Sequence, residues 1–207
     1  MSAQLKVAIV EDDPSMRNAL VRLLSAAGIE SSGHASADEF VRDEDCTEFD
    51  CLVVDVHLPR MDGLQLQAKL KRLAPFAALI FITGRSDLSV GMHAMRQGAI
   101  DFLEKPVDEA ALLAAIQRGA EVSRKQRETH GERLLLEQRC ESLTPREREV
   151  FGLITKGLLN KQAGAELGTT ERTIKAHRAR VMEKMGADSL AELVRMASLL
   201  GIHENRN

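Results

Sequence analysis

The feature that most constrains the fold of this chain is the alternation of short apolar runs with longer amphipathic stretches in its first half. The apolar runs cover residues 5–10, 51–56, 78–83 and 99–103, with a weaker run at residues 28–32. Runs of this length that alternate with helical patterns are typical of βα units, in which crossover helices cover a parallel sheet. The pattern therefore predicts an α/β domain over residues 1–122, a (βα)5 doubly wound parallel sheet with strand order 2-1-3-4-5.

The pattern then becomes purely helical, and a sharp helix start opens a second domain. Thr144, Pro145 and Glu147 have the spacing of a capping box with proline at the first helical position. Helical segments follow over residues 145–156, 160–167, 171–185 and 189–200. Two short helices joined by a tight glycine turn are typical of a helix-turn-helix. We therefore predict a small all-α helix-turn-helix domain over residues 143–207.

Charge is divided unevenly between the two halves of the chain. Residues 1–122 carry a net charge of −7 and residues 123–207 a net charge of +4. This asymmetry favours a polyanion as the ligand of the second half only. Residues 123–142 are rich in charge and are predicted to form a helical linker, with Gly131 as its expected break.

The sequence carries no pattern of a membrane or exported protein. No apolar run approaches the roughly 18 residues that a membrane span needs, and the N-terminus lacks the features of a signal peptide. We therefore expect a cytoplasmic protein without membrane contact. Cys46, Cys51 and Cys140 lack CxxC spacing and a neighbouring histidine pair, so neither a disulfide framework nor a zinc site is expected.

Acidic, basic and hydroxyl side chains gather at the expected carboxyl ends of four strands. They are Glu11 and Asp12 after the first strand, Asp55 at the end of the third, Thr83 at the end of the fourth and Lys105 after the fifth. Ligands of doubly wound sheets bind at this edge, where the first and third strands are neighbours. Carboxylates this close repel one another unless a cation joins them, and hard oxygen ligands suit Mg²⁺. Asp55 is therefore predicted to be a nucleophile that accepts a phosphoryl group as an aspartyl phosphate.

Each of these residues has an ordinary explanation when it is taken alone. Acids after a strand commonly supply charge to a helix N-terminus, and Asp55 alone is compatible with a loop acid. Thr83 alone fits a strand former, and Lys105 alone fits a solvated surface lysine. Their joint placement at four strand ends favours the phosphoryl site.

The strings VAIVEDD, VVDVHLPRMDG, FITG and AIDFLEKP resemble the receiver domain of two-component response regulators over residues 4–122. The resemblance implies a flavodoxin-like receiver fold with Asp55 as the phospho-acceptor. It further implies Glu11 and Asp12 as metal-binding acids, the backbone carbonyl of His57 as another metal ligand, Lys105 as the conserved lysine, Thr83 and Phe102 as switch residues, and a cis Lys105–Pro106 bond. Glu11 departs from the commonest family pattern, which has Asp, and its longer side chain is expected to shift the metal geometry without abolishing binding.

Residues 171–185 have the pattern of a recognition helix when they are projected at about 100° per residue. Ile174, Val181 and Met185 fall on one face, with His177 at its edge. The opposite arc carries Arg172, Lys175, Ala176, Ala179 and Arg180. Small residues allow close approach to a major groove, where Arg and Lys reach bases and phosphates. A charged helix face is commonly just solvated, but the preceding helix and the positive charge favour DNA contact here.

The strings LTPREREVFGLITKGLLNKQAGAELG and TTERTIKAHRARVMEKM resemble the LuxR-type helix-turn-helix, from Leu143 to about Ile202. The resemblance implies structural roles for Glu147 and Val150. It implies contacts to the DNA backbone from Asn160 and Lys161, and a DNA-facing set of Thr173, Lys175, His177 and Arg178. A receiver followed by this module is the architecture of the NarL/FixJ response regulators.

These resemblances predict a DNA-binding response regulator rather than an enzyme. A sensor histidine kinase is expected to phosphorylate Asp55 with Mg²⁺ as cofactor. The chain is then expected to form a homodimer, bind promoter DNA and regulate transcription with RNA polymerase, with activation favoured over repression. Leu88, Met92 and Met95 recur at helical spacing and are either core residues or part of the dimer surface.

Two alternatives remain open at this point. One is a constitutive DNA-binding regulator whose receiver serves only for dimerisation. The other is an aspartyl-phosphate phosphatase of the haloacid-dehalogenase kind, which also uses a strand-end Asp and Mg²⁺. That class expects a second acid two residues after the nucleophile, where this chain has His57.

Overall fold

The computed structural model describes residues 5–43, 45–84 and 88–202, and the chain divides into two compact units. The first unit covers residues 1–127 and the second residues 128–207. Each unit has hydrophobic clusters of its own. Within the described ranges, no helix is both long and apolar enough to cross a membrane.

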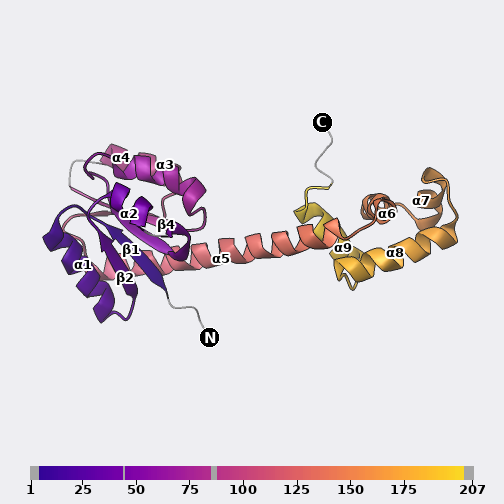
Figure 1. The fold of residues 1–207 in the computed structure, drawn as a ribbon, viewed down its shortest axis with the longest axis horizontal. Helices are drawn as coiled ribbons and strands as arrows, with labels where there is room; N and C mark the ends of the chain where they lie inside the picture. Colours follow the sequence, from indigo (N-terminus) through magenta and orange to yellow (C-terminus); the bar gives the residue numbers. More distant parts are fainter. Residues whose placement is uncertain (1–4, 44, 85–87, 203–207) are drawn as a thin grey trace. The chain divides into compact units, whose positions relative to one another are not determined.

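The first unit is a five-stranded parallel sheet with helices on both faces (Figure 1). Its elements are β1 (Lys6–Val10), α1 (Pro14–Ala26), β2 (Glu30–His34), α2 (Ala37–Asp43), the short 3-10 helix η1 (Cys46–Glu48), β3 (Cys51–Asp55), α3 (Gly63–Leu73), β4 (Ala78–Thr83), α4 (Leu88–Arg96), β5 (Asp101–Glu104) and α5 (Glu109–Glu141). The strand order is β2-β1-β3-β4-β5, so the predicted doubly wound sheet and its order are confirmed.

The central strand β3 shows why this sheet needs two helical layers. Leu52 and Val54 belong to the hydrophobic cluster that includes residues of α2, α3 and α4. Cys51 and Val53 belong to the cluster that includes residues of α1 and α5. All five residues of β3 are buried, and only the last, Asp55, is polar. A carboxylate in this place lies at the carboxyl edge of the sheet, where ligands of such folds bind.

Helix caps fix the two loops that carry the acidic residues. Asp13 is the N-cap of α1 and accepts hydrogen bonds from two amides of the first turn, with Pro14 at the first helical position. Asp62 and Gln65 form a reciprocal capping box at the start of α3. Both loops are therefore held at the point where each chain segment enters its helix.

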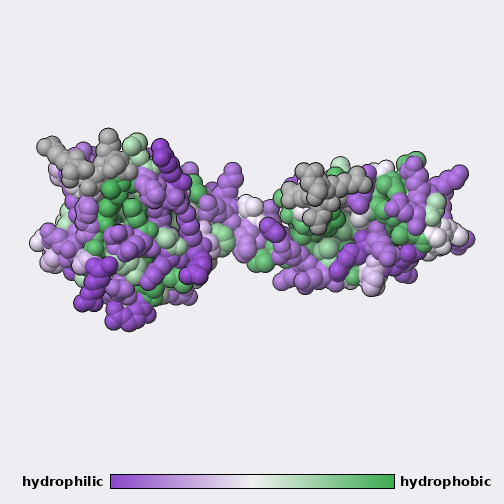
Figure 2. Space-filling model, turned by 90° about the horizontal axis from the view of Figure 1, so that it is seen from above, coloured by the Kyte–Doolittle hydropathy of each residue, from purple (hydrophilic) through white to green (hydrophobic). Residues whose placement is uncertain are grey.

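The second unit is helical. In Figure 2 the visible surface of each unit is largely hydrophilic, and apolar groups show among the hydrophilic ones. The helices of the second unit are the end of α5, α6 (Pro145–Thr155), α7 (Asn160–Glu166), α8 (Glu171–Met185) and α9 (Leu190–Leu199). The bounds of α6 to α9 agree with the predicted segments within one residue, and the capping box of Thr144 and Glu147 is present. Gly157 and Gly168 have φ of 91° and 62°, so the turns before α7 and α8 use the left-handed conformation that glycine adopts without strain.

Helix α5 continues without a break from Glu109 to Glu141, so the predicted break at Gly131 is wrong. A helix-interior glycine costs only about 1 kcal/mol relative to alanine, and the flanking Glu, Arg and Leu residues favour helix. The end of α5 contributes to the second core, because Leu136 is 8% exposed and packs in that cluster. Its neighbour Leu135 is 49% exposed.

Candidate functional site

Four of the predicted site residues lie at the carboxyl edge of the sheet in the first unit. Glu11 follows β1, Asp55 ends β3, Thr83 ends β4 and Lys105 follows β5. Glu11, Asp55 and Thr83 are buried, with exposed fractions of 1%, 6% and 1%. Because an unpaired buried charge is costly, both carboxylates require a positive partner.

Lys105 supplies that positive charge. Its Nζ lies 2.7 Å from Asp55 Oδ2, as a hydrogen bond, and 2.8 Å from Glu11 Oε2. Burial raises the pKa of Glu11 above its usual value, against the effect of Lys105 and with a contribution from the charge of Asp55. Burial opposes the charge on Lys105, but hydrogen bonding and attraction to Asp55 and Glu11 outweigh it and raise the pKa of the amine. The carboxyl edge of the sheet therefore holds two acids and one base, and the charge of each affects the protonation of the others.

The carboxylates of Glu11, Asp12 and Asp55 have the arrangement of a site for a divalent cation. One oxygen from each lies within 4.8 Å of the others, and Asp12 is exposed while its two neighbours are buried. Glu11 Oε2 is buried, and the contact that the described residues give it is the ion pair with Lys105 at 2.8 Å. Carboxylate oxygens in a partly open site are the ligands that Mg²⁺ prefers. The donor set therefore fits Mg²⁺.

The surrounding backbone holds the predicted phospho-acceptor in place. The amide of His57 donates to Asp55 Oδ1 over 3.0 Å. The Lys105–Pro106 peptide bond is cis, as predicted. Phe102 is half-buried on β5, and its ring lies against Gly91 of α4, where an added Cβ would come within 2.8 Å of three ring carbons. Glycine at that position therefore makes room for the Phe102 ring.

Arg17 on α1 also contacts the acidic loop and is absent from the residues predicted for the site. Its Nη1 donates to the backbone carbonyl of Glu11 over 2.6 Å and to that of Asp12 over 3.2 Å. The signal that could have found it is its spacing from the N-cap Asp13. Side chains one turn into a helix point back toward its N-terminus, which here places Arg17 over the loop.

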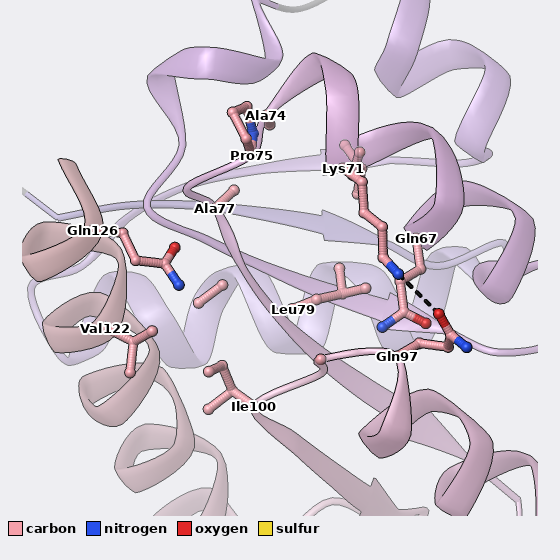
Figure 3. Close-up of a pocket in the computed structure, with 13 residues that line it drawn as sticks. Gln67, Lys71, Ala74, Pro75, Ala77, Leu79, Gln97, Ile100, Val122 and Gln126 are labelled. Atoms are coloured by element: carbon pink, nitrogen blue, oxygen red, sulfur yellow. Dashed lines mark hydrogen bonds between the residues drawn. The ribbon is translucent and has the colours of Figure 1, made fainter. Parts of the chain in front are cut away.

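A separate pocket of about 170 Å³ lies near the beginnings of β4 and β5, at the opposite edge of the sheet (Figure 3). Gln67 and Lys71 of α3, Gln97, and Val122 and Gln126 of α5 are among its lining residues, and Lys71 Nζ donates to Gln97 Oε1 over 2.8 Å. None of its lining residues is Asp, Glu, His, Cys or Ser. Unlike the carboxyl edge, this pocket therefore offers no carboxylate, imidazole or thiol ligand to a metal ion.

Helix α8 of the second unit has the two faces predicted from its sequence. Ile174, Val181 and Met185 are fully buried in the core. The residues of the basic arc are all exposed, namely Arg172, Lys175, Ala176, Ala179 and Arg180. This confirms the predicted amphipathic arrangement and leaves the arc accessible to a ligand.

Three other residues that the resemblance places against DNA are half-buried in the free chain. Thr173 Oγ1 shares a hydrogen bond of 2.8 Å with the N-cap hydroxyl of Thr170. Arg178 Nη1 donates to Asn160 Oδ1 over 3.4 Å, which connects α8 to α7. His177 Nδ1 is buried without a hydrogen-bond partner among the described residues. Lys161 on α7 is exposed.

Glu147, which is buried in the first turn of α6, forms an ion pair with the partly exposed Lys184. Lys184 Nζ lies 2.6 Å from Glu147 Oε2, and the Thr144 amide donates to the same oxygen over 2.9 Å. The hydrogen bond from Lys184, followed by that from the Thr144 amide, lowers the pKa of Glu147 to about 2. This pair joins the recognition helix α8 to the N-terminus of α6.

Glu147 therefore gives the second unit an acid-sensitive stabilisation. Since its folded-state pKa of about 2 lies below the ordinary value of 4.5, the contribution is complete above 4.5 and is lost as the pH falls toward 2. Glu147→Gln is expected to lower stability at about pH 7 and to remove much of the difference between about pH 7 and about pH 3. Urea unfolding of both proteins at the two pH values checks this, and parallel losses of stability would contradict it.

Comparison with protein families decides the identity of the first unit. Residues 7–117, more than half of the chain, match the family described as "Response regulator receiver domain". The chain belongs to the response regulators. Residues 141–197 of this response regulator match "Bacterial regulatory proteins, luxR family".

Relatives resemble the response regulator over nearly its full length. Nodulation protein W of Bradyrhizobium diazoefficiens is 43% identical over 99% of this chain and 90% of its own. Transcriptional regulatory protein FixJ of Azorhizobium caulinodans is 38% identical over 98% and 96%. The solved structure of response regulator StyR has a TM-score of 0.83 and 39% identity, covering 95% of this chain and 99% of its own. Full-length FixJ from B. japonicum has a TM-score of 0.59 and 34% identity, over 97% and 99%.

These comparisons confirm the predicted family and fold class. The response regulator is a DNA-binding transcription regulator of a two-component system, with a receiver and a LuxR-type helix-turn-helix. Its family implies a histidine kinase and DNA as its classes of partner and is generally non-enzymatic.

Gly63, the first residue of α3 in the response regulator, is a sensitive point because it packs against the backbone of Asp55. An added Cβ would lie 2.7 Å from the Asp55 carbonyl oxygen and 2.8 Å from the Phe81 ring. Gly63→Ala is therefore expected to destabilise the receiver by about 1–3 kcal/mol and to slow phosphorylation, because the backbone of Asp55 must shift. Gly131→Ala is the control, since nothing lies within 4 Å of its Cβ in helix α5. Thermal unfolding and acetyl phosphate labelling check both variants, and wild-type behaviour of Gly63→Ala would contradict the prediction.

Proposed function

We propose that a sensor histidine kinase phosphorylates the response regulator on Asp55 in the cytoplasm, and that the phosphorylated chain forms a homodimer and activates transcription by RNA polymerase at promoter DNA. The carrying observation is the position of the Asp55 carboxylate. It lies 2.7 Å from Lys105 Nζ and within 4.8 Å of the Glu11 and Asp12 carboxylates.

Phosphoryl transfer to Asp55 follows from the groups around it. A carboxylate oxygen of Asp55 attacks phosphorus, a P–O bond forms, and the P–N bond of the kinase phosphohistidine breaks with its electron pair leaving on nitrogen. Mg²⁺ held by Glu11, Asp12, Asp55 and the backbone carbonyl of His57 would supply positive charge to the phosphoryl oxygens. Lys105 neutralises a further part of that charge, and the His57 amide keeps the carboxylate oriented.

The proposed switch uses Thr83 and Phe102. Thr83 ends β4 beside Asp55 on β3, and its side chain is buried where a hydroxyl can approach a phosphoryl group. Phe102 is on the next strand, β5, with its ring against Gly91 of α4. Movement of Thr83 toward the phosphoryl group would open space for the ring to turn inward, which changes the surface of α4 and β5.

The same surface supports a homodimer interface. Met92 and Met95 on α4 are 54% and 44% exposed, so the alternative that they are core residues is wrong, while the side chain of Leu88 lies outside the described part of the chain. Exposed apolar side chains on one helix face are suited to a protein contact. Two helix-turn-helix modules held on neighbouring half-sites gain affinity by effective concentration, so dimerisation is a sufficient switch for DNA binding.

Sedimentation of the full chain with Mg²⁺, in the presence and absence of beryllofluoride, tests the proposal. We expect a monomer without the phosphoryl analogue and a dimer with it, together with tighter binding to promoter DNA. A dimer under both conditions would favour a receiver that serves only for dimerisation. A monomer under both conditions with stimulated DNA binding would replace dimerisation by release of an intramolecular block.

Two exposed lysines of the helix-turn-helix, Lys175 and Lys161, separate specific from general DNA contacts. Lys175→Ala, on the exposed arc of α8, is expected to weaken binding to the preferred site by about 1–3 kcal/mol and to reduce discrimination between sites. Lys161→Ala, on α7, is expected to weaken binding to all sequences about equally. Lys175 pairs with Glu171, at 3.2 Å on the exposed helix surface, so its loss leaves the fold intact. Titrations at fixed salt that show the reverse pattern would contradict the proposed docking.

A further inference from the structure

We propose that Arg17 is a positioning residue for the cation site, and that it sets the affinity of the Glu11 and Asp12 pair for a divalent cation. This inference rests on the proposed function of that edge as a Mg²⁺ site. Its basis is the contact of one guanidinium with two successive backbone carbonyls, those of the two residues that carry the acids.

The Arg17 side chain is held beside the acidic loop by contacts of its aliphatic part and of its guanidinium group. Its aliphatic part lies over Gly33 of β2, where an added Cβ would come within 3.0 Å of Arg17 Cγ. Its Nη1 then reaches the carbonyl oxygens of Glu11 at 2.6 Å and Asp12 at 3.2 Å. Glycine at position 33 therefore leaves the space through which the side chain passes to the acidic loop.

The other contacts of this loop hold its two ends. The Glu11 amide donates to the His34 carbonyl over 3.1 Å, as a continuation of the β1–β2 pairing. At the other end, the Asp13 carboxylate caps α1, and the Asp13 amide donates to Glu11 Oε1 over 3.3 Å. Arg17 is the contact that orients the peptide carbonyls between these ends, and with them the directions in which the Glu11 and Asp12 side chains leave the backbone.

Arg17 differs from Lys105 in what it touches. Lys105 contacts the carboxylate oxygens of Glu11 and Asp55 directly, whereas these hydrogen bonds of Arg17 go to carbonyl oxygens. Arg17 itself therefore does not compete with a cation for the carboxylate oxygens. Loss of Arg17 has two opposed consequences: removal of a nearby positive charge favours cation binding, and loss of loop geometry opposes it. Positioning and plain electrostatics therefore predict opposite signs, which makes the inference testable.

The test is a Mg²⁺ titration of the full-length wild-type chain and of Arg17→Gln, Arg17→Lys and Arg22→Gln by calorimetry, with thermal unfolding in the absence of metal. Arg22 is the matched control because it lies exposed on the same helix and carries the same charge. We expect the Mg²⁺ dissociation constant of Arg17→Gln to rise roughly tenfold or more, as for other residues that orient metal ligands, with Arg22→Gln unchanged and Arg17→Lys in between.

Acetyl phosphate labelling of the same variants gives a second measurement. At saturating Mg²⁺ the labelling rate of Arg17→Gln is expected to approach that of the wild type, whereas half-saturation moves to higher Mg²⁺. Equal or tighter Mg²⁺ binding by Arg17→Gln would overturn the inference, and so would a change confined to the unfolding temperature. Absence of Mg²⁺ binding by the wild-type chain would instead overturn the proposed function.

Discussion

Replacement of Asp55 by asparagine is expected to reduce Mg²⁺-dependent labelling by acetyl phosphate to background. Asp55 ends the central strand β3, where it contacts Lys105 and lies within 4.8 Å of the Glu11 and Asp12 carboxylates. An asparagine amide in this place would keep the size of the side chain but lacks a carboxylate nucleophile. Phosphate-affinity gels and the alkali lability of an acyl phosphate measure the outcome. Substantial alkali-labile phosphate on Asp55→Asn would falsify the assignment.

Two neighbouring substitutions control for a general loss of charge at this edge. Asp13→Asn removes one negative charge but retains a residue that caps α1 well, so labelling is expected to persist. Asp12→Asn removes a proposed cation ligand and is expected to lose labelling at low Mg²⁺ and to regain part of it at high Mg²⁺. Equal loss in all three variants would indicate that labelling depends on charge rather than on Asp55.

The fold of the receiver could be predicted from the sequence because most of its strands and helices are marked by the pattern of residues within each element. Four of the strands contain short apolar runs bounded by turns or helix caps, whereas β2 is polar and was marked mainly by its place between two helical patterns. The strand order is one of the two common doubly wound orders. The convergence of Glu11, Asp55 and Lys105 followed from that order alone. The contacts that depend on side-chain paths were not predictable in this way. The packing of Phe102 on Gly91 has no periodic signature, and the spacing of Arg17 from the N-cap Asp13 indicates only that its side chain lies near the loop, not which atoms it contacts.

The helix-turn-helix was predicted in its elements but only in part in its contacts. Projection of α8 identified the buried face of Ile174, Val181 and Met185, because the apolar residues that recur at helical spacing are the ones buried in the core. It could not show that Arg178 contacts Asn160, since that hydrogen bond joins two helices. The expected break at Gly131 was wrong because a single glycine weighs less than the helix-favouring residues around it.

The second large expected effect is a loss of stability on substitution of Leu136. This residue packs in the core of the second unit, although it precedes Leu143, where the second domain was predicted to begin. Leu136 is 8% exposed in the second core, whereas Leu135 is 49% exposed. Leu136→Ala is expected to destabilise the second unit by about 2–5 kcal/mol, and Leu135→Ala by less than about 0.5 kcal/mol. Both changes have nearly the same effect on helix propensity, so burial accounts for the difference. Because the chain has no Trp or Tyr, far-ultraviolet circular dichroism follows the unfolding.

The same contacts predict how fragments of the response regulator behave. A fragment of residues 143–207 loses Leu136 and also Arg139, whose Nη1 donates to the Met185 carbonyl at the end of α8 over 2.9 Å. It also loses the Ser142 carbonyl, to which Lys184 donates over 3.1 Å. Domains of this size have little stability to spare, so we expect residues 128–207 to unfold cooperatively and residues 143–207 to be largely unfolded at the same temperature. Equal melting temperatures of the two fragments would place the domain boundary at Leu143, and the end of α5 would then be a linker that adds nothing to the DNA-binding fold.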